Sequence, residues 1–181
     1  RGRVAALVRQ RRYRRKMHAV YADTHHPMTS DALTGLFSHG FLHAHLEHQI
    51  EDAERWEKTL SLGFFDVDNM AAVNAEHGYV AGDRLLHQIG GIIGRLVRGE
   101  DVAARFRGDK FVVALPETAA QVAELVMQRI VGVVDNTEFA IADGHCAVNA
   151  ALKSAVTAFV PGDTAETLIA RARAQVPLSQ I

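Results

Sequence analysis

Residues 102–115, VAARFRGDKFVVAL, consist of two apolar runs on either side of the tripeptide Arg107-Gly108-Asp109. Two strand-like runs separated by a short turn that contains glycine are typical of a β-hairpin. The run LSLGFFDV at residues 60–67 is short and almost continuously apolar, and Asp66 and the following Asp68 stand at its end. This pattern predicts a buried strand whose carboxylates emerge where the strand stops.

Apolar residues recur at helical spacing between these strands. They predict helices at about residues 41–56, 69–75, 82–97 and 122–133, and a last helix that runs to Ala174. A further core strand is predicted at about residues 146–156. This order, with helices between strands and one hairpin in the middle, predicts a single α/β domain with a mixed sheet.

The composition fits one globular domain, because 48% of the 181 residues are hydrophobic. The net charge of −1 conceals an uneven distribution. Residues 1–16 contain eight basic and no acidic side chains, which leaves 12 basic and 21 acidic residues, or −9, for the rest of the chain. Two interpretations of this basic arm remain open: a patch that binds nucleic acid or another anion, and a linker helix from a preceding domain. An incomplete apolar stripe favours the linker helix.

The single cysteine, Cys146, excludes an internal disulfide framework and fits a reducing compartment. No apolar run approaches the roughly 18 residues that span a bilayer, and no signal-peptide pattern is present. We therefore expect a cytoplasmic chain with no membrane segment.

Two carboxylates are the first candidates for chemistry. Asp66 at a strand end and Asp109 at a hairpin tip are oxygen ligands of the kind that hold Mg²⁺ beside phosphates. Taken alone, each is better explained as a residue that caps a turn. The surrounding motifs decide between the two.

These motifs occur in a characteristic order: DALTGL at residues 31–36, DVDNMAAVN at 66–74, Gly82-Asp83, Arg98-x-x-Asp101, and the turn RGDKF at 107–111. The set resembles the GGDEF family, the diguanylate cyclase domains that condense two GTP molecules into cyclic di-GMP. The resemblance covers about residues 29–174. It implies a central, mostly antiparallel five-stranded sheet surrounded by helices, related to the adenylyl cyclase core.

The resemblance also implies roles for single residues. Asp66 matches the metal-binding aspartate of the family, and Asn74 and Asp83 match the residues that hydrogen-bond the guanine of GTP. The signature turn departs from the family: Arg107 replaces the first glycine and Lys110 replaces the glutamate, while Gly108, Asp109 and Phe111 complete the turn. We therefore expect a catalytically degenerate site, in which Asp66 and Asp109 hold Mg²⁺ only if GTP binding persists.

The inhibitory site of the family is retained. Arg98 and Asp101 form an intact Arg-x-x-Asp pattern, and Arg129 falls where some members supply a second arginine to the same ligand. Arginine can fork onto guanine O6 and N7, and a carboxylate can accept from the guanine Watson–Crick edge. The alternative is an Arg98–Asp101 ion pair on the surface, which contributes little to stability.

The favoured hypothesis is a degenerate GGDEF domain that acts as a receptor for cyclic di-GMP and relays this signal to a protein partner, with a ligand-linked homodimer as one arrangement. The alternatives are a weak cyclase and a GTP-sensing or protein-interaction module. By resemblance, residues 1–28 form a basic linker helix after a receiver domain, and 29–181 form the output domain of a response regulator. Such a regulator would act in the bacterial cell cycle, with recruitment to a cell pole. Nucleic acid is not an expected partner.

Overall fold

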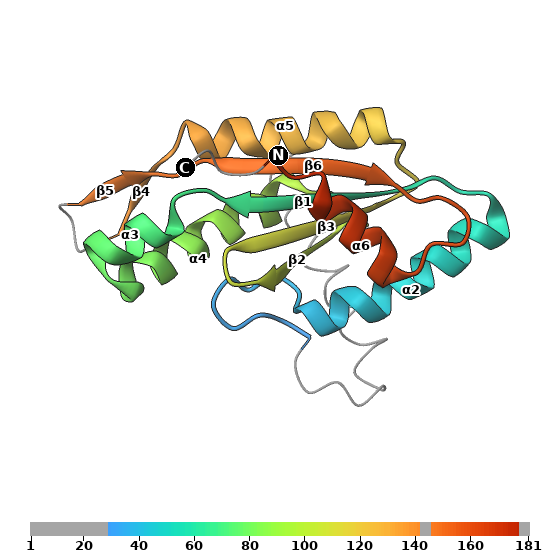
Figure 1. Ribbon diagram of the computed structural model, residues 1–181, viewed down its shortest axis with the longest axis horizontal. Helices are drawn as coiled ribbons and strands as arrows, with labels where there is room; N and C mark the ends of the chain where they lie inside the picture. Colours follow the sequence, from blue (N-terminus) through green and yellow to red (C-terminus); the bar gives the residue numbers. More distant parts are fainter. Residues whose placement is uncertain (1–28, 142–145, 178–181) are drawn as a thin grey trace, which may run out of the picture.

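The computed structural model describes residues 29–141 and 146–177. The predicted linker helix at residues 1–28 lies outside the described residues. The elements follow one another, as Figure 1 shows, in the order α2 (His39–Trp56), β1 (Leu60–Val67), α3 (Met70–His77), α4 (Tyr79–Leu96), β2 (Val102–Arg107), β3 (Lys110–Pro116), α5 (Ala120–Asp135), β4 (Glu138–Ala140), β5 (Ala147–Asn149), β6 (Leu152–Ala158) and α6 (Ala165–Ala174).

Four of these strands form the central sheet, in the order β2-β3-β1-β6, and every neighbouring pair is antiparallel. The pairing of β1 with β3 runs from Leu60 opposite Pro116 to Asp66 opposite Lys110. The predicted hairpin is confirmed, since β2 and β3 are consecutive strands joined by a tight turn. The acidic end of β1 therefore lies beside the turn of that hairpin.

The α/β fold with a mostly antiparallel sheet is confirmed, but the expected count of five central strands is wrong among the described residues. The segment predicted as one strand at residues 146–156 forms two strands. β5 pairs with β4 in a separate two-stranded sheet, whereas β6 pairs with β1. The chain changes partner between them, where Asp135 Oδ1 accepts the N–H of Leu152 at 3.1 Å. At the opposite edge, Phe37 adds a one-residue parallel bridge to β2.

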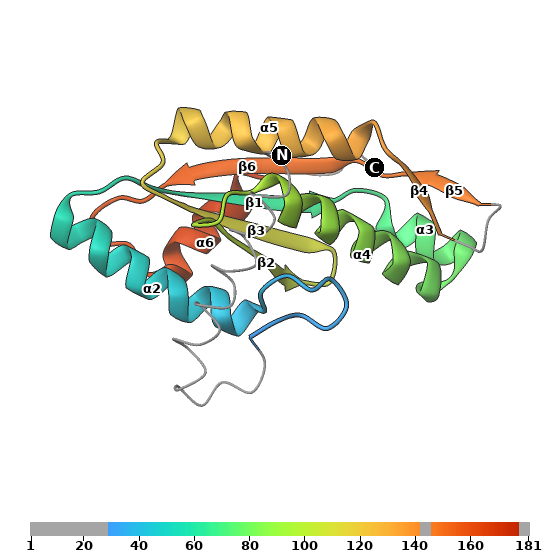
Figure 2. The same cartoon turned by 180° about the vertical axis from the view of Figure 1, so that it is seen from behind.

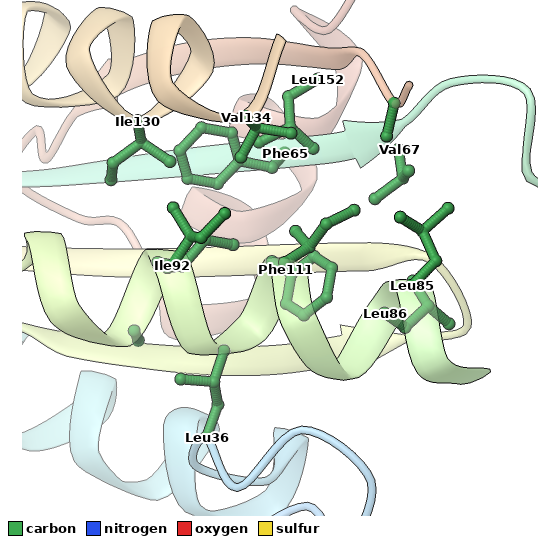
Figure 3. Close-up of a cluster of buried hydrophobic side chains, with 14 of the residues drawn as sticks. Leu36, Phe65, Val67, Leu85, Leu86, Ile92, Phe111, Ile130, Val134 and Leu152 are labelled. Carbon is green, nitrogen blue, oxygen red and sulfur yellow. The ribbon is translucent and has the colours of Figure 1, made fainter. Parts of the chain in front are cut away.

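Helices cover both faces of the central sheet, as Figures 1 and 2 show from opposite sides. Alternate residues of each strand face opposite ways, so each face has its own core. On one face α4 and α5 pack against Phe65, Val67, Phe111 and other side chains, several of which are labelled in Figure 3. On the other face α2 and α6 pack against Leu62, Phe64 and Val112.

Gly63 lets α5 lie close to the sheet. A Cβ atom at this position would lie 2.3 Å from Sδ of Met127, far closer than packed atoms allow. The missing side chain therefore lets Met127 of α5 pack directly on the backbone of β1.

Within the described residues no helix combines the length and the apolarity needed to cross a membrane.

Candidate functional site

The turn between β2 and β3 carries the sequence RGDKF and is shaped by Gly108. This residue has φ +57°, a left-handed conformation that glycine adopts without strain. Its carbonyl accepts a hydrogen bond from Nε of Arg105 at 2.8 Å. The Arg107 side chain is exposed, and the pairing of β2 with β3 shifts register between Arg105 and Arg107.

Lys110 lies between the two predicted metal ligands. Its Nζ donates to Oδ1 of Asp66 at 3.0 Å and to Oδ1 of Asp109 at 2.9 Å. Partial burial disfavours the ammonium, but the hydrogen bonds and negative charges of Asp109 and Asp66 raise the pKa of Lys110 above its ordinary value. The side chain is therefore a cation at neutral pH.

The structure brings Asp66 and Asp109 together, as a metal site would require. The group that joins the two carboxylates is the ammonium of Lys110. Magnesium needs oxygen ligands at about 2.0–2.1 Å in near-octahedral geometry. Here one oxygen of each carboxylate already accepts from Lys110. In residues 29–141 and 146–177 no group of three or more His, Cys, Asp or Glu side chains could hold a metal ion. The residues present therefore do not fit a Mg²⁺ ion.

Asn74 lies on α3 and Asp83 near the start of α4, the two helices that follow β1 in the chain (Figure 1). The two helices meet at Gly78, where a φ of +84° makes a sharp corner between them. Asn74 packs on Gly82, where an added Cβ would lie 2.0 Å from its Oδ1. That oxygen is buried and has no hydrogen-bond partner among the described residues. Asn74 thus lies beside the segment that carries the exposed Asp83, and the two offer an amide and a carboxylate of the kind that hydrogen-bond guanine.

Arg98, Asp101 and Arg129 come together where α4 ends. Oδ2 of Asp101 accepts the backbone N–H of Arg98 at 2.7 Å. Arg129 reaches across from α5, and its Nη2 donates to the carbonyl oxygen of Leu96 at 2.5 Å. A guanidinium at this position also complements the negative end of the α4 dipole. The structure therefore places both exposed arginines beside the 96–101 segment.

The carboxylate of Asp101 is buried, with 5% of the residue exposed. Its Oδ1 has no hydrogen-bond partner among the described residues. Burial raises the pKa of Asp101, although the N–H of Arg98 and the positive charges of Arg98 and Arg129 act in the opposite direction. A surface ion pair does not describe this group, because the carboxylate is buried and bonded to backbone.

Arg105 is a positioning residue that the sequence did not single out. Its Nη1 lies 3.4 Å from both carboxylate oxygens of Asp31, and its Nε holds the signature turn at Gly108. Asp31 in turn accepts from the N–H and the hydroxyl of Thr34 at 2.8 and 2.7 Å. Arg105 therefore joins the DALTGL segment to the turn. The available signal was a charged residue inside an otherwise apolar strand.

The chain is similar to known signalling proteins along most of its length. The family model for "Diguanylate cyclase, GGDEF domain" matches residues 28–177. The diguanylate cyclase DgcP of Pseudomonas aeruginosa is 28% identical over 155 residues, which are 86% of this chain and 23% of that protein. The response regulator PleD of Caulobacter vibrioides is 30% identical over 144 residues, which are 79% of this chain and 32% of that protein. The chain thus spans less than a third of either relative.

Solved structures show the same fold. The GGDEF domain of DgcB from Caulobacter crescentus, in complex with c-di-GMP, has a TM-score of 0.78 at 24% identity, covering 83% of this chain and 89% of that chain. The diguanylate cyclase SiaD of Pseudomonas aeruginosa, in complex with its activator SiaC, has a TM-score of 0.78 at 28% identity, covering 94% of this chain and 64% of that chain.

Proposed function

Because the chain belongs to the GGDEF family of diguanylate cyclase domains, we propose that it is a receptor for cyclic di-GMP and that its signature turn is catalytically degenerate. The ligand would bind at Arg98, Asp101 and Arg129. Two sites are distinguished: one at the C-terminal end of α4 that retains its ligand-binding residues, and one at the turn between β2 and β3 in which Lys110 stands where the family has an acidic residue.

The arrangement at the end of α4 is the observation that carries the receptor proposal. Two exposed arginines lie beside a buried carboxylate, one oxygen of which has no hydrogen-bond partner within residues 29–141 and 146–177. Cyclic di-GMP offers two anionic phosphates and two guanine edges, and the arginine fork matches both kinds of acceptor. Asp101 holds the backbone of Arg98 through its Oδ2, so the chain that carries this arginine is ordered before ligand arrives. The c-di-GMP complex of DgcB supports the choice of ligand.

The signature turn supports the second part of the proposal. Condensation of GTP depends on metal ions that neutralise phosphate charge and activate the attacking hydroxyl. At this turn a single ammonium is bound to both Asp66 and Asp109. In addition, Arg107 stands where the family has glycine, the residue that lets a nucleotide approach the backbone closely.

A weak cyclase is the second candidate, and the retention of Asp66, Asn74 and Asp83 favours it. An assay with GTP and Mg²⁺ at high protein concentration separates the two candidates. The degenerate turn predicts no cyclic di-GMP above background. Product that forms in the wild type and disappears in Asp66→Ala would establish the cyclase instead.

The receptor would relay its ligand state through a protein partner. The structure of the diguanylate cyclase SiaD in complex with its activator SiaC is a precedent for such a partner. In this proposal residues 29–181 form an output domain in the cytoplasm, and residues 1–28 link it to a preceding domain.

Calorimetric titration with cyclic di-GMP tests the receptor proposal. We expect saturable binding to the wild type and a loss of affinity of about tenfold or more in Arg98→Ala, as for other charged contacts at ligand sites. Arg95→Ala is the matched control, because Arg95 is also exposed and lies one turn earlier on α4. No binding to the wild type, or equal binding to both variants, would refute the proposal.

A further inference from the structure

We infer that Lys110 is a built-in substitute for the divalent cation of this family: its ammonium joins the two carboxylates of the signature turn, so this turn does not recruit a metal ion. The inference concerns the end of the sheet opposite the Arg98 site. It therefore stands or falls independently of cyclic di-GMP binding.

The position of Lys110 is imposed by the sheet. In the antiparallel pairing of β1 with β3, Lys110 is directly opposite Asp66. Side chains of directly opposite residues project from the same face, with their Cβ atoms about 4.5–5.5 Å apart. A lysine at this position thus meets Asp66 without any rearrangement of the backbone. The ion pair, with Nζ 3.0 Å from Oδ1 of Asp66, follows from the register.

The second carboxylate is held in place by the backbone. The N–H of Val67 donates to the carbonyl oxygen of Asp109 at 3.1 Å, which ties the tip of the hairpin to the end of β1. Asp109 therefore stays close to Asp66. An acidic residue at position 110 would place a third negative charge in this group, directly opposite Asp66, and like charges in that arrangement are destabilising. A metal ion or a lysine can each offset the repulsion between these neighbouring carboxylates.

Nearby cations strengthen this conclusion. Asp66 has a lysine opposite it on each neighbouring strand, Lys110 on β3 and Lys153 on β6. Lys153 is bound to Asp68, with its Nζ 3.3 Å from Oδ2. Arg107 adds a further positive charge at the turn. The charges of Asp66, Asp109, Lys110 and Arg107 cancel, so the turn is neutral without a bound ion. A divalent cation would have to break both hydrogen bonds of Lys110 and then remain beside the released ammonium.

Binding of Mn²⁺, followed by the loss of the free-ion signal in electron paramagnetic resonance, tests the inference on the complete chain. We expect no saturable binding to the wild type. Lys110→Glu replaces the cation by a third carboxylate, and we expect its Mn²⁺ affinity to exceed that of the wild type by about tenfold or more. Lys153→Glu is the matched control, because it makes the same change of charge on the other side of Asp66 while it leaves Lys110 in place. We expect no gain of Mn²⁺ binding in this control.

Saturable Mn²⁺ binding to the wild type would overturn the inference, and so would equal affinities of Lys110→Glu and Lys153→Glu. Three clustered carboxylates could also prevent Lys110→Glu from folding without metal. Lys110→Met covers that case, since it removes the ammonium and adds no charge. We expect Mn²⁺ to raise the melting temperature of Lys110→Met relative to EDTA and to leave that of the wild type unchanged. The same response in both proteins would contradict the substitution of metal by lysine.

Discussion

Replacing Lys110 by methionine keeps the aliphatic stem and removes the charge that joins Asp66 to Asp109. Two unit charges about 3 Å apart attract by about 1.4 kcal/mol in the dielectric of water. The lysine is 26% exposed and each aspartate 32%, so solvent screens both pairs, and ordering of the long side chain offsets part of the gain. Each pair should therefore contribute a net stabilisation of about 0.5–1 kcal/mol. We therefore expect Lys110→Met to lower the free energy of unfolding by about 1–2 kcal/mol.

Urea denaturation at pH 7.5 and low salt measures this loss, and Lys153→Met provides the comparison. Lys153 is similarly buried, and among the described residues it forms one ion pair, with Asp68, so its variant should lose about half as much. The difference in free energy of unfolding between Lys110→Met and the wild type should shrink in 1 M salt, which screens the ion pairs. It should also shrink as pH rises above 10.5, because the raised pKa of Lys110 makes its contribution complete below that value and lost above it. Equal losses in the two variants, or a more stable Lys110→Met, would refute the role of Lys110 as a bridge between two carboxylates.

Three further predictions concern other parts of the molecule. Gly82→Ala should lower the free energy of unfolding by about 1–3 kcal/mol in urea denaturation, because the added methyl group would displace the Asn74 amide. An unchanged denaturation midpoint would contradict this close packing. Arg129→Ala should weaken cyclic di-GMP binding in calorimetry and also lower the melting temperature, since the carbonyl of Leu96 loses its donor. Burial, with a smaller effect of the His48 charge, lowers the pKa of His45 to about 4. Stability should therefore fall as pH drops from about 6.5 to 4, by up to about 3 kcal/mol, and the slope should be flatter in His45→Leu.

Much of the fold could be predicted from local pattern. The alternation of apolar residues, the continuous run at residues 60–67 and the Gly-containing turn are sufficient to locate β1 and the β2–β3 hairpin. The division of the last predicted strand could not be found in this way, because β5 and β6 differ in the strands that they pair with. The choice of partner depends on contacts between residues that are far apart in the sequence, such as the hydrogen bond between Asp135 and Leu152, 17 residues apart.

The residues of the candidate sites could be predicted from the sequence, but the contacts that these residues make could not. The sequence identified Lys110 as a departure from the family, but its simultaneous bonds to Asp66 and Asp109 depend on the register of β1 with β3. It identified Asp101 as a ligand-binding group, whereas the structure shows a buried carboxylate that also holds the backbone of Arg98. Burial and register are properties of the assembled sheet, so a motif alone does not reveal them.

The absence of a side chain at Gly63 has a mechanical consequence. Met127 fills the space above this residue, so α5 can neither sink towards β1 nor slide along it without a collision. Arg129 lies only two residues further along α5, and its hydrogen bond to the carbonyl oxygen of Leu96 joins that helix to the end of α4. α4 has 18 residues, is about 27 Å long and carries Asp83 near its other end. The glycine thus seats on the sheet a helix that holds the end of α4 through Arg129.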